Sequence, residues 1–134
     1  MKKMKYFFIG LALALILAIG IYALLRPPKF DSDNMKTVTL ITLPSPPKYK
    51  TVNDKKDIKK CVDYINSLTL SPAIYNRKGW WFEIKMDEKT TLTFYGQYVS
   101  INGIFYKIKD KDYEAELRNL YNGLNYKEGD WREG

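Results

Sequence analysis

The feature that most constrains this chain is an uncharged apolar run near its N-terminus, from Tyr6 to Leu25. As an α-helix rising ~1.5 Å per residue, a run of this length spans ~30 Å, the thickness of the hydrocarbon core of a bilayer. Three lysines precede the run, and the cytoplasmic ends of membrane helices carry an excess of positive charge. The pattern predicts a single-pass transmembrane signal-anchor with a cytoplasmic N-terminus and the rest of the chain outside the cell.

A cleaved secretion signal is the alternative interpretation of the same run. Ala18-Ile19-Gly20 offers small residues at a suitable cleavage position. The apolar run continues through Leu25 beyond that position, which favours an uncleaved anchor, and no cysteine follows it as a lipoprotein would require. We therefore expect residues 1–26 to form a cytoplasmic stub and membrane anchor, followed by a linker over residues 27–34.

The rest of the chain has a small net charge and lacks two residue types on which many sites depend. Four of the 22 Lys and Arg flank the apolar run, which leaves 18 basic against 15 acidic side chains and a net charge of +3. This small net charge is typical of a soluble protein surface, whereas a nucleic-acid-binding surface needs enough basic side chains for many phosphate contacts. The chain has no histidine and a single cysteine, Cys61, which excludes His/Cys zinc sites and an intramolecular disulfide. We expect no cofactor, no metal and no nucleic-acid ligand.

Apolar residues after the linker recur at helical spacing in two segments and at strand spacing in five. The helical segments are Asp54–Ser67 and a second helix that begins after a cap at Asp110 and carries an apolar stripe to Leu124. The predicted strands are Met35–Leu43, Trp80–Met86, Lys89–Tyr95, Tyr98–Ile101 and Ile104–Ile108. Tight turns separate the last four, and Asn102-Gly103 is the strongest two-residue hairpin signal.

The predicted order is β-α-β-β-β-β-α, with Thr69–Gly79 as a loop. An antiparallel sheet with both helices on one face is the packing that buries all of these apolar sets with short connections. The sequence therefore predicts an α+β domain over residues 35–126, followed by a C-terminal tail over residues 127–134.

Two resemblances follow from this order and these segments. The β-α-β4-α order resembles one repeat of the TATA-binding-protein-like fold, a curved sheet backed by two helices, and this likeness implies no function by itself. A family of small secreted or membrane-anchored extracytoplasmic domains of unknown function in Gram-positive, clostridial-type bacteria is similar over roughly Lys36–Tyr126. The similar stretches are DKKDIKKCVDYINSL, KGWWFEIKM, LTFYGQYVSINGIFYKI and YEAELRNLYNGLNY. This resemblance implies no catalytic residues.

Two adjacent tryptophans open the second predicted strand, and neighbouring side chains of a strand point to opposite faces. Alternation puts Trp80 inside with Phe82, and Trp81 outside with Glu83. The same rule puts Ile104 inside with its strand's other apolar residues. It also puts four aromatic residues outside, on the sheet face away from the helices, where they form one candidate binding patch: Trp81, Tyr95, Tyr98 and Phe105.

Simpler interpretations of these aromatic residues remain open. Cross-strand pairs stabilise a sheet by ~0.2–1 kcal/mol each without any ligand, and the tail could fold across the patch through Trp131. No catalytic motif such as GxSxG or a glycine-rich phosphate loop is present, so we predict that the protein is not an enzyme.

The function that the sequence favours is a non-catalytic, membrane-anchored extracytoplasmic domain that binds a protein or a cell-envelope polymer. A cleaved, secreted binding or inhibitor protein is the alternative, and a small cell-envelope enzyme is a third candidate. The identity of the partner and the oligomeric state do not follow from the sequence.

Overall fold

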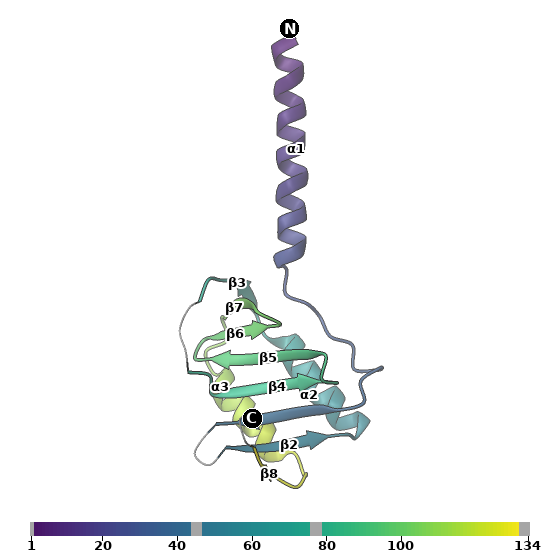
Figure 1. Ribbon diagram of the computed structural model, residues 1–134, viewed down its shortest axis with the longest axis vertical. Helices are drawn as coiled ribbons and strands as arrows, with labels where there is room; N and C mark the ends of the chain where they lie inside the picture. Colours follow the sequence, from purple (N-terminus) through teal and green to yellow (C-terminus); the bar gives the residue numbers. More distant parts are fainter. Residues whose placement is uncertain (1, 44–46, 76–78, 132–134) are drawn as a thin grey trace.

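A computed structural model describes residues 2–43, 47–75 and 79–131 and separates the chain into a long helix and an α+β domain (Figure 1). Helix α1, Lys2–Leu25, is the predicted apolar helix, and none of its most apolar part is buried against the domain. The 22 residues Lys3–Leu24 reach a mean hydropathy of 2.6. The helix is long and apolar enough to cross a membrane or to serve as a signal sequence.

The domain is built on one antiparallel sheet, which has eight strands among the described residues. The order across the sheet is β3-β7-β6-β5-β4-β1-β2-β8, so the short strands β3 and β8 form the two edges. Short edges, one of them ending in proline, leave few free backbone groups for pairing with another chain. The strands are β1 Val38–Thr42, β2 Lys48–Val52, β3 Leu70–Pro72, β4 Phe82–Met86, β5 Thr90–Tyr95, β6 Tyr98–Ile101, β7 Ile104–Ile108 and β8 Gly129–Asp130.

Helices α2, Lys55–Ser67, and α3, Tyr113–Gly123, both lie behind the sheet in Figure 1 and close a single core with it. Their buried stripes meet one set of strand side chains, and the predicted α+β arrangement of an antiparallel sheet with helices is confirmed. The largest fully buried side chains are Tyr106, Tyr113, Phe82, Phe94, Leu40, Ile41, Ile58, Ile84, Leu92, Ile108, Leu117 and Val38.

The two helices begin differently. Asp54 caps α2 by accepting a hydrogen bond from the Lys56 N–H at 2.9 Å. The cap position of α3 is Asp112, two residues later than the predicted cap at Asp110, and the helix starts at Tyr113. The side chain of Asp110 instead accepts a hydrogen bond from the Thr69 N–H at 2.7 Å, which ties the start of β3 to the end of β7.

The predicted strand order missed β2, β3 and β8. Strand β2 has the sequence KYKTV, and its inward position opposite Leu40 is taken by Lys50, so the apolar alternation fails there. Strand β3 has three residues and β8 has two, which is too short for a periodic pattern. The sheet therefore continues past Tyr126 into the segment expected to be a tail.

The segment between α1 and β1 is docked on the domain rather than extended away from it. Asn66 on α2 binds the backbone of Phe30 twice: its Oδ1 accepts the N–H at 2.9 Å, and its Nδ2 donates to the carbonyl at 2.8 Å. The Asp87 carboxylate accepts the N–H groups of Thr37 and Lys36 at 2.8 Å each, and these bonds lower the pKa of Asp87. These hydrogen bonds hold the segment against the domain at Phe30 and again at Lys36 and Thr37.

Two hairpin turns require positive φ at both central residues. Asn102 (φ 49°) and Gly103 (φ 90°) meet this requirement with the residues best suited to it, and the predicted hairpin is present. The β4–β5 turn has Asp87 (φ 50°) and Glu88 (φ 59°) instead. A glutamate in the left-handed region is strained, because its Cβ approaches the following carbonyl oxygen.

Replacing Glu88 by glycine is expected to raise the free energy of unfolding by about 1 kcal/mol, because glycine carries no Cβ in the left-handed region. Chemical unfolding of the two proteins measures the difference. Lys89→Gly is the matched control, since Lys89 is not among the residues with positive φ, and this change is expected to destabilise. A loss of stability in Glu88→Gly as large as in the control would contradict the expectation.

Candidate functional site

Three of the four residues predicted to form the binding patch lie together on the outer face of the sheet. Tyr95 and Tyr98 are directly paired across the β5–β6 turn, and Phe105 on β7 pairs with Ser100 of β6. The ring centroids of Tyr95 and Phe105 are 5.8 Å apart. All three rings are half-buried, while their strand neighbours on the opposite face belong to the core.

A fourth ring, which sequence reasoning missed, completes this group. Tyr75, in the segment between β3 and β4, stacks on Tyr98 with a centroid distance of 4.3 Å and an interplanar angle of 21°. Its ring is also 5.6 Å from Tyr95 and 5.7 Å from Phe105. The signal in the sequence was the pair Ile74-Tyr75, two large apolar residues inside a predicted loop. We call Tyr75, Tyr95, Tyr98 and Phe105 the aromatic cluster.

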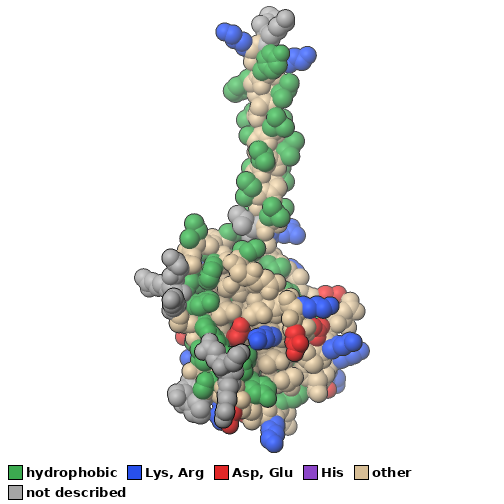
Figure 2. All heavy atoms as spheres, in the orientation of Figure 1, with side chains coloured by type: hydrophobic (Ala, Val, Ile, Leu, Met, Phe, Trp, Pro, Cys, Tyr) green, Lys and Arg blue, Asp and Glu red, His purple; other side chains and the backbone are tan. Residues whose placement is uncertain are grey.

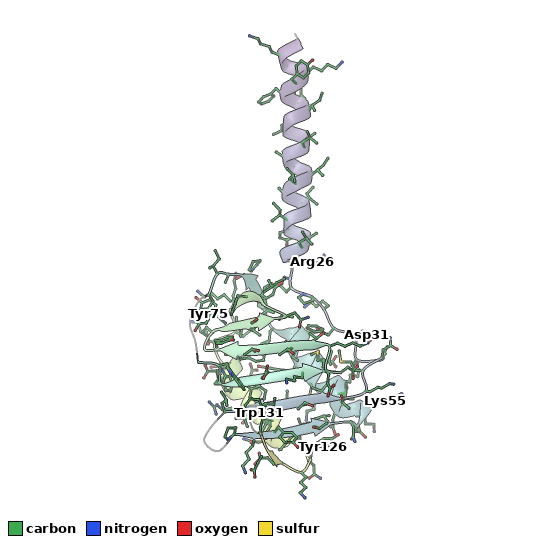
Figure 3. All side chains as sticks on the ribbon, viewed as in Figure 1. Arg26, Asp31, Lys55, Tyr75, Tyr126 and Trp131 are labelled. Carbon is green, nitrogen blue, oxygen red and sulfur yellow. The ribbon has the colours of Figure 1, made fainter. Side chains whose placement is uncertain are left out.

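The aromatic cluster forms part of a larger apolar region of the outer face. Figure 3 labels Tyr75 at the left margin of the sheet, and Figure 2 shows hydrophobic side chains gathered along that side of the same face. Charged side chains occupy the middle of the face in Figure 2. The apolar surface is therefore concentrated on one side of the sheet.

The predicted outward position of Trp81 is wrong. Its ring packs against the core on the helix side, where the indole Nε1 donates to the hydroxyl of Tyr113 on α3 at 3.2 Å. The Arg118 guanidinium, also on α3, lies over the same ring at 4.7 Å from its centroid. Trp81 thus joins the sheet to α3 and is not part of the outer surface.

The alternation fails at this point because two residues of one strand face a single partner. Phe82 pairs with Phe94 of β5, and the Trp81 N–H donates to the carbonyl of the same Phe94 at 3.0 Å. This two-against-one arrangement is that of a β-bulge, which shifts the facing of the residues before it by one. Trp80, predicted to lie inside, is accordingly half-buried outside the core and meets Trp131 edge to face at 5.5 Å.

The tail covers one tryptophan rather than the aromatic cluster. The Trp131 N–H donates to the Pro47 carbonyl at 3.0 Å, which fixes the tail beside β2. Among the described ring contacts, Trp131 touches Trp80 and no member of the cluster. In the described residues, Trp131 therefore meets Trp80, which is not a member of the predicted patch, and does not fold across the patch.

A second correction concerns Ile104, which was expected inside. It is 43% exposed, although the alternate residues of the same strand, Tyr106 and Ile108, are buried. Ile104 begins β7 directly after the Asn102-Gly103 turn, so it lies at the rim of the sheet.

Tyr113 fixes the turn that carries two rings of the cluster. Its hydroxyl donates to the Gly96 carbonyl, between Tyr95 and Tyr98, while it accepts the Trp81 indole N–H. Burial raises the pKa of Tyr113 to about 12, so the phenol stays protonated and can donate at any physiological pH. The chain of bonds from Trp81 through Tyr113 to Gly96 holds the turn against α3.

The thiol of Cys61 is buried, and the charged groups of the surface pocket beside Arg118 are already engaged. Burial raises the pKa of the Cys61 thiol to about 11, so the thiolate that a nucleophile needs is scarce at neutral pH. No group of three or more acidic or cysteine side chains suited to a metal occurs in the described part of the chain. A surface pocket of about 230 Å³ beside Arg118 is lined by Lys48, which is paired with Asp130, and Glu128, which accepts the Tyr121 hydroxyl.

Comparison with protein-family models, with curated proteins and with solved structures gave no match. The likeness to a TATA-binding-protein-like repeat and to a Gram-positive family thus stays a prediction. A function for the chain has to come from its own geometry, and the aromatic cluster is the feature of that geometry best suited to recognition.

Proposed function

We propose that the protein is a non-catalytic domain anchored in the cell membrane by α1, and that its aromatic cluster binds a protein or a cell-envelope polymer outside the cell. The observation that carries this proposal is the convergence of four half-buried rings on the sheet face that α2 and α3 leave uncovered. Rings of this kind offer large rigid apolar area, and the three tyrosines add hydroxyl groups for hydrogen bonds.

The surroundings of the cluster favour a polar or anionic partner. Ser100 pairs with Phe105, and the exposed Lys107 pairs with Tyr98, so hydroxyl and ammonium groups lie beside the rings. Contact surfaces commonly combine an aromatic centre with a polar rim. A hydroxyl-rich or acidic envelope polymer, or a protein surface of that character, matches this arrangement.

The position outside the cell rests on α1 and on the charge around it. Lys2, Lys3 and Lys5 precede the apolar part of the helix, and the positive-inside rule then leaves the domain on the far side of the membrane. The resemblance to anchored or secreted domains of Gram-positive bacteria supports the same location. The TATA-binding-protein-like topology is proposed for the architecture alone and adds no ligand. A secreted binding protein, with α1 removed, is the alternative.

The anchor is tested by the fate of the N-terminus. The mature chain is expected to keep Met1 or Lys2, to sediment with membranes, and to lose its domain to protease added outside intact cells, because α1 stays in the bilayer. N-terminal sequencing of the mature protein and protease protection measure this. A mature N-terminus at Ile21, found in the medium, would support the secreted alternative instead.

The binding role is tested by removing two rings that strands carry. The double variant Tyr95→Ser, Tyr98→Ser is expected to unfold cooperatively and to stay in the membrane but to lose crosslinking to its partner in intact cells, because it removes half of the cluster and none of the core. Tyr126→Ser is the control: this tyrosine is half-buried, bonds to Asp57 of α2 and lies outside the cluster. Unchanged partner crosslinking by the double variant would leave the rings with a purely stabilising role.

A further inference from the structure

Two apolar side chains of the domain are exposed without an evident structural reason. Outside α1, the large hydrophobic residues that the described structure leaves exposed are Ile74, at 100%, and Ile104, at 43%. One exposed isoleucine is common on protein surfaces, but a contiguous group of apolar residues marks a contact with another phase or molecule. The question is whether the two side chains lie together.

The strand register places them along the same edge of the sheet. Strand β3 pairs with β7 through Ser71↔Lys107 and Pro72↔Tyr106. The pairing continues past the strand, because the Ala73 N–H donates to the Phe105 carbonyl at 3.1 Å. Ile74 follows Ala73 and Ile104 precedes Phe105, so the two exposed isoleucines flank one bonded pair along the same edge of the sheet.

This edge of the sheet is the one nearest the end of α1, as Figure 1 shows. Arg26 and Pro27, directly after the helix, line a surface pocket of about 600 Å³ together with residues 66–70, which lead into β3. The Lys29 ammonium donates to the Asn66 carbonyl at 2.7 Å and holds the two segments together. If α1 spans a bilayer, the β3–β7 edge faces the bilayer surface from which α1 emerges.

Basic side chains accompany the isoleucines at this edge. Lys107 and Lys109 on and after β7 are exposed, as is Arg26. Asp110, the acidic residue that follows the two lysines in the chain, accepts the Thr69 N–H. Lysine and arginine close to a membrane are attracted by anionic lipid headgroups, and exposed apolar side chains enter the interfacial layer.

We propose that the β3–β7 edge rests on the bilayer surface beside α1, with Ile74 and Ile104 in the interfacial layer and Lys107 and Lys109 against anionic headgroups. This inference rests on the proposed function, because it requires α1 to span the membrane. The sheet then stands upright on the bilayer, and its outer face with the aromatic cluster is open sideways to a partner (Figure 1).

The test uses the full chain in vesicles that contain phosphatidylglycerol and a headgroup-level lipid quencher. A fluorophore is attached to one introduced cysteine at a time, in Ile74→Cys, Ile104→Cys or Lys127→Cys, and wild type controls for labelling of the buried Cys61. Lys127 is the matched control, because it is exposed and precedes β8 at the opposite edge of the sheet. Labels at 74 and 104 are expected to be quenched several-fold more strongly than the label at 127.

The second part of the test changes the charge of the lipid or of the protein. Phosphatidylcholine vesicles, or the double change Lys107→Glu, Lys109→Glu, are expected to reduce the quenching at 74 and 104. Equal quenching at positions 74, 104 and 127 overturns the proposal. A protein partner bound to this edge would shield the labels at 74 and 104 from lipid, and that result overturns the proposal too. Quenching that does not depend on lipid charge overturns the role given to the two lysines.

A label at Leu15→Cys in α1 separates this inference from the proposed function. Lipid quenchers placed deep in the acyl chains report on the label at position 15, and headgroup-level quenchers report on the labels at 74 and 104. Strong quenching at 15 without quenching at 74 and 104 leaves the anchor standing and rejects the docked edge. No quenching at position 15 rejects the anchor, and the docked edge with it.

Discussion

Replacing Phe94 by alanine is expected to lower the free energy of unfolding by about 3–5 kcal/mol. Phe94 is fully buried on β5, where its ring stacks on Tyr113 at 5.9 Å and meets Phe82 edge to face at 6.2 Å. Alanine loses the transfer free energy of the ring and leaves a cavity between the sheet and α3, which the surrounding side chains fill only in part. Equilibrium unfolding of the full chain in detergent measures the loss.

Tyr95→Ala is the matched control for this prediction. Tyr95 is the next residue on the same strand, but its ring lies on the outer face, so the change removes cross-strand contacts worth ~0.2–1 kcal/mol each. The difference between the two losses of stability therefore reports which face of the sheet each side chain occupies. Equal losses in the two variants would mean that the assignment of the faces is wrong.

Replacing Lys50 by methionine is expected to cost about 1.5–3 kcal/mol, the scale of hydrogen bonds to a charged group. The Lys50 side chain is buried, and its ammonium donates to the carbonyls of Tyr121, at 2.8 Å, and Leu124, at 3.0 Å. It also lies 4.5 Å from the centroid of the Tyr121 ring. A positive charge at this place offsets the partial negative charge at the end of α3.

The control is Lys48→Met on the same strand. Lys48 pairs with Asp130 at an exposed position, where water and salt screen the interaction, so a clearly smaller loss is expected. Each of the two carbonyls that Lys50 binds also accepts one backbone N–H, which limits the loss in Lys50→Met. A loss no larger in Lys50→Met than in the control would show that the buried lysine is not the cap of α3.

Locally encoded elements could be predicted from the sequence. Strands β6 and β7 have the predicted bounds, β4 and β5 differ by one or two residues at one end, and α2 and α3 follow their apolar stripes. These elements depend on alternation, helical spacing and short turns, all of which act between residues close in the chain. The three ring positions Tyr95, Tyr98 and Phe105 were predicted together for the same reason.

The features that escaped prediction depend on residues far apart in the chain. Lys50 interrupts the apolar pattern of β2 because its partners are carbonyls on α3, more than 70 residues away. The bulge that turns Trp81 toward α3 is set by its bond to Phe94 and by Tyr113 on the helix. Tyr75 joins the aromatic cluster only because the segment after β3 returns across the outer face.

Site-specific photocrosslinking in intact cells shows whether the aromatic cluster binds a partner. A photoreactive residue in place of Tyr98 lies within the aromatic cluster, and one in place of Lys127 provides an exposed control outside it. A discrete crosslinked species formed outside the membrane is expected from position 98 and none from position 127. Crosslinks from position 98 that stay within the chain, or the same adduct from both positions, would mean that the aromatic cluster does not bind a partner.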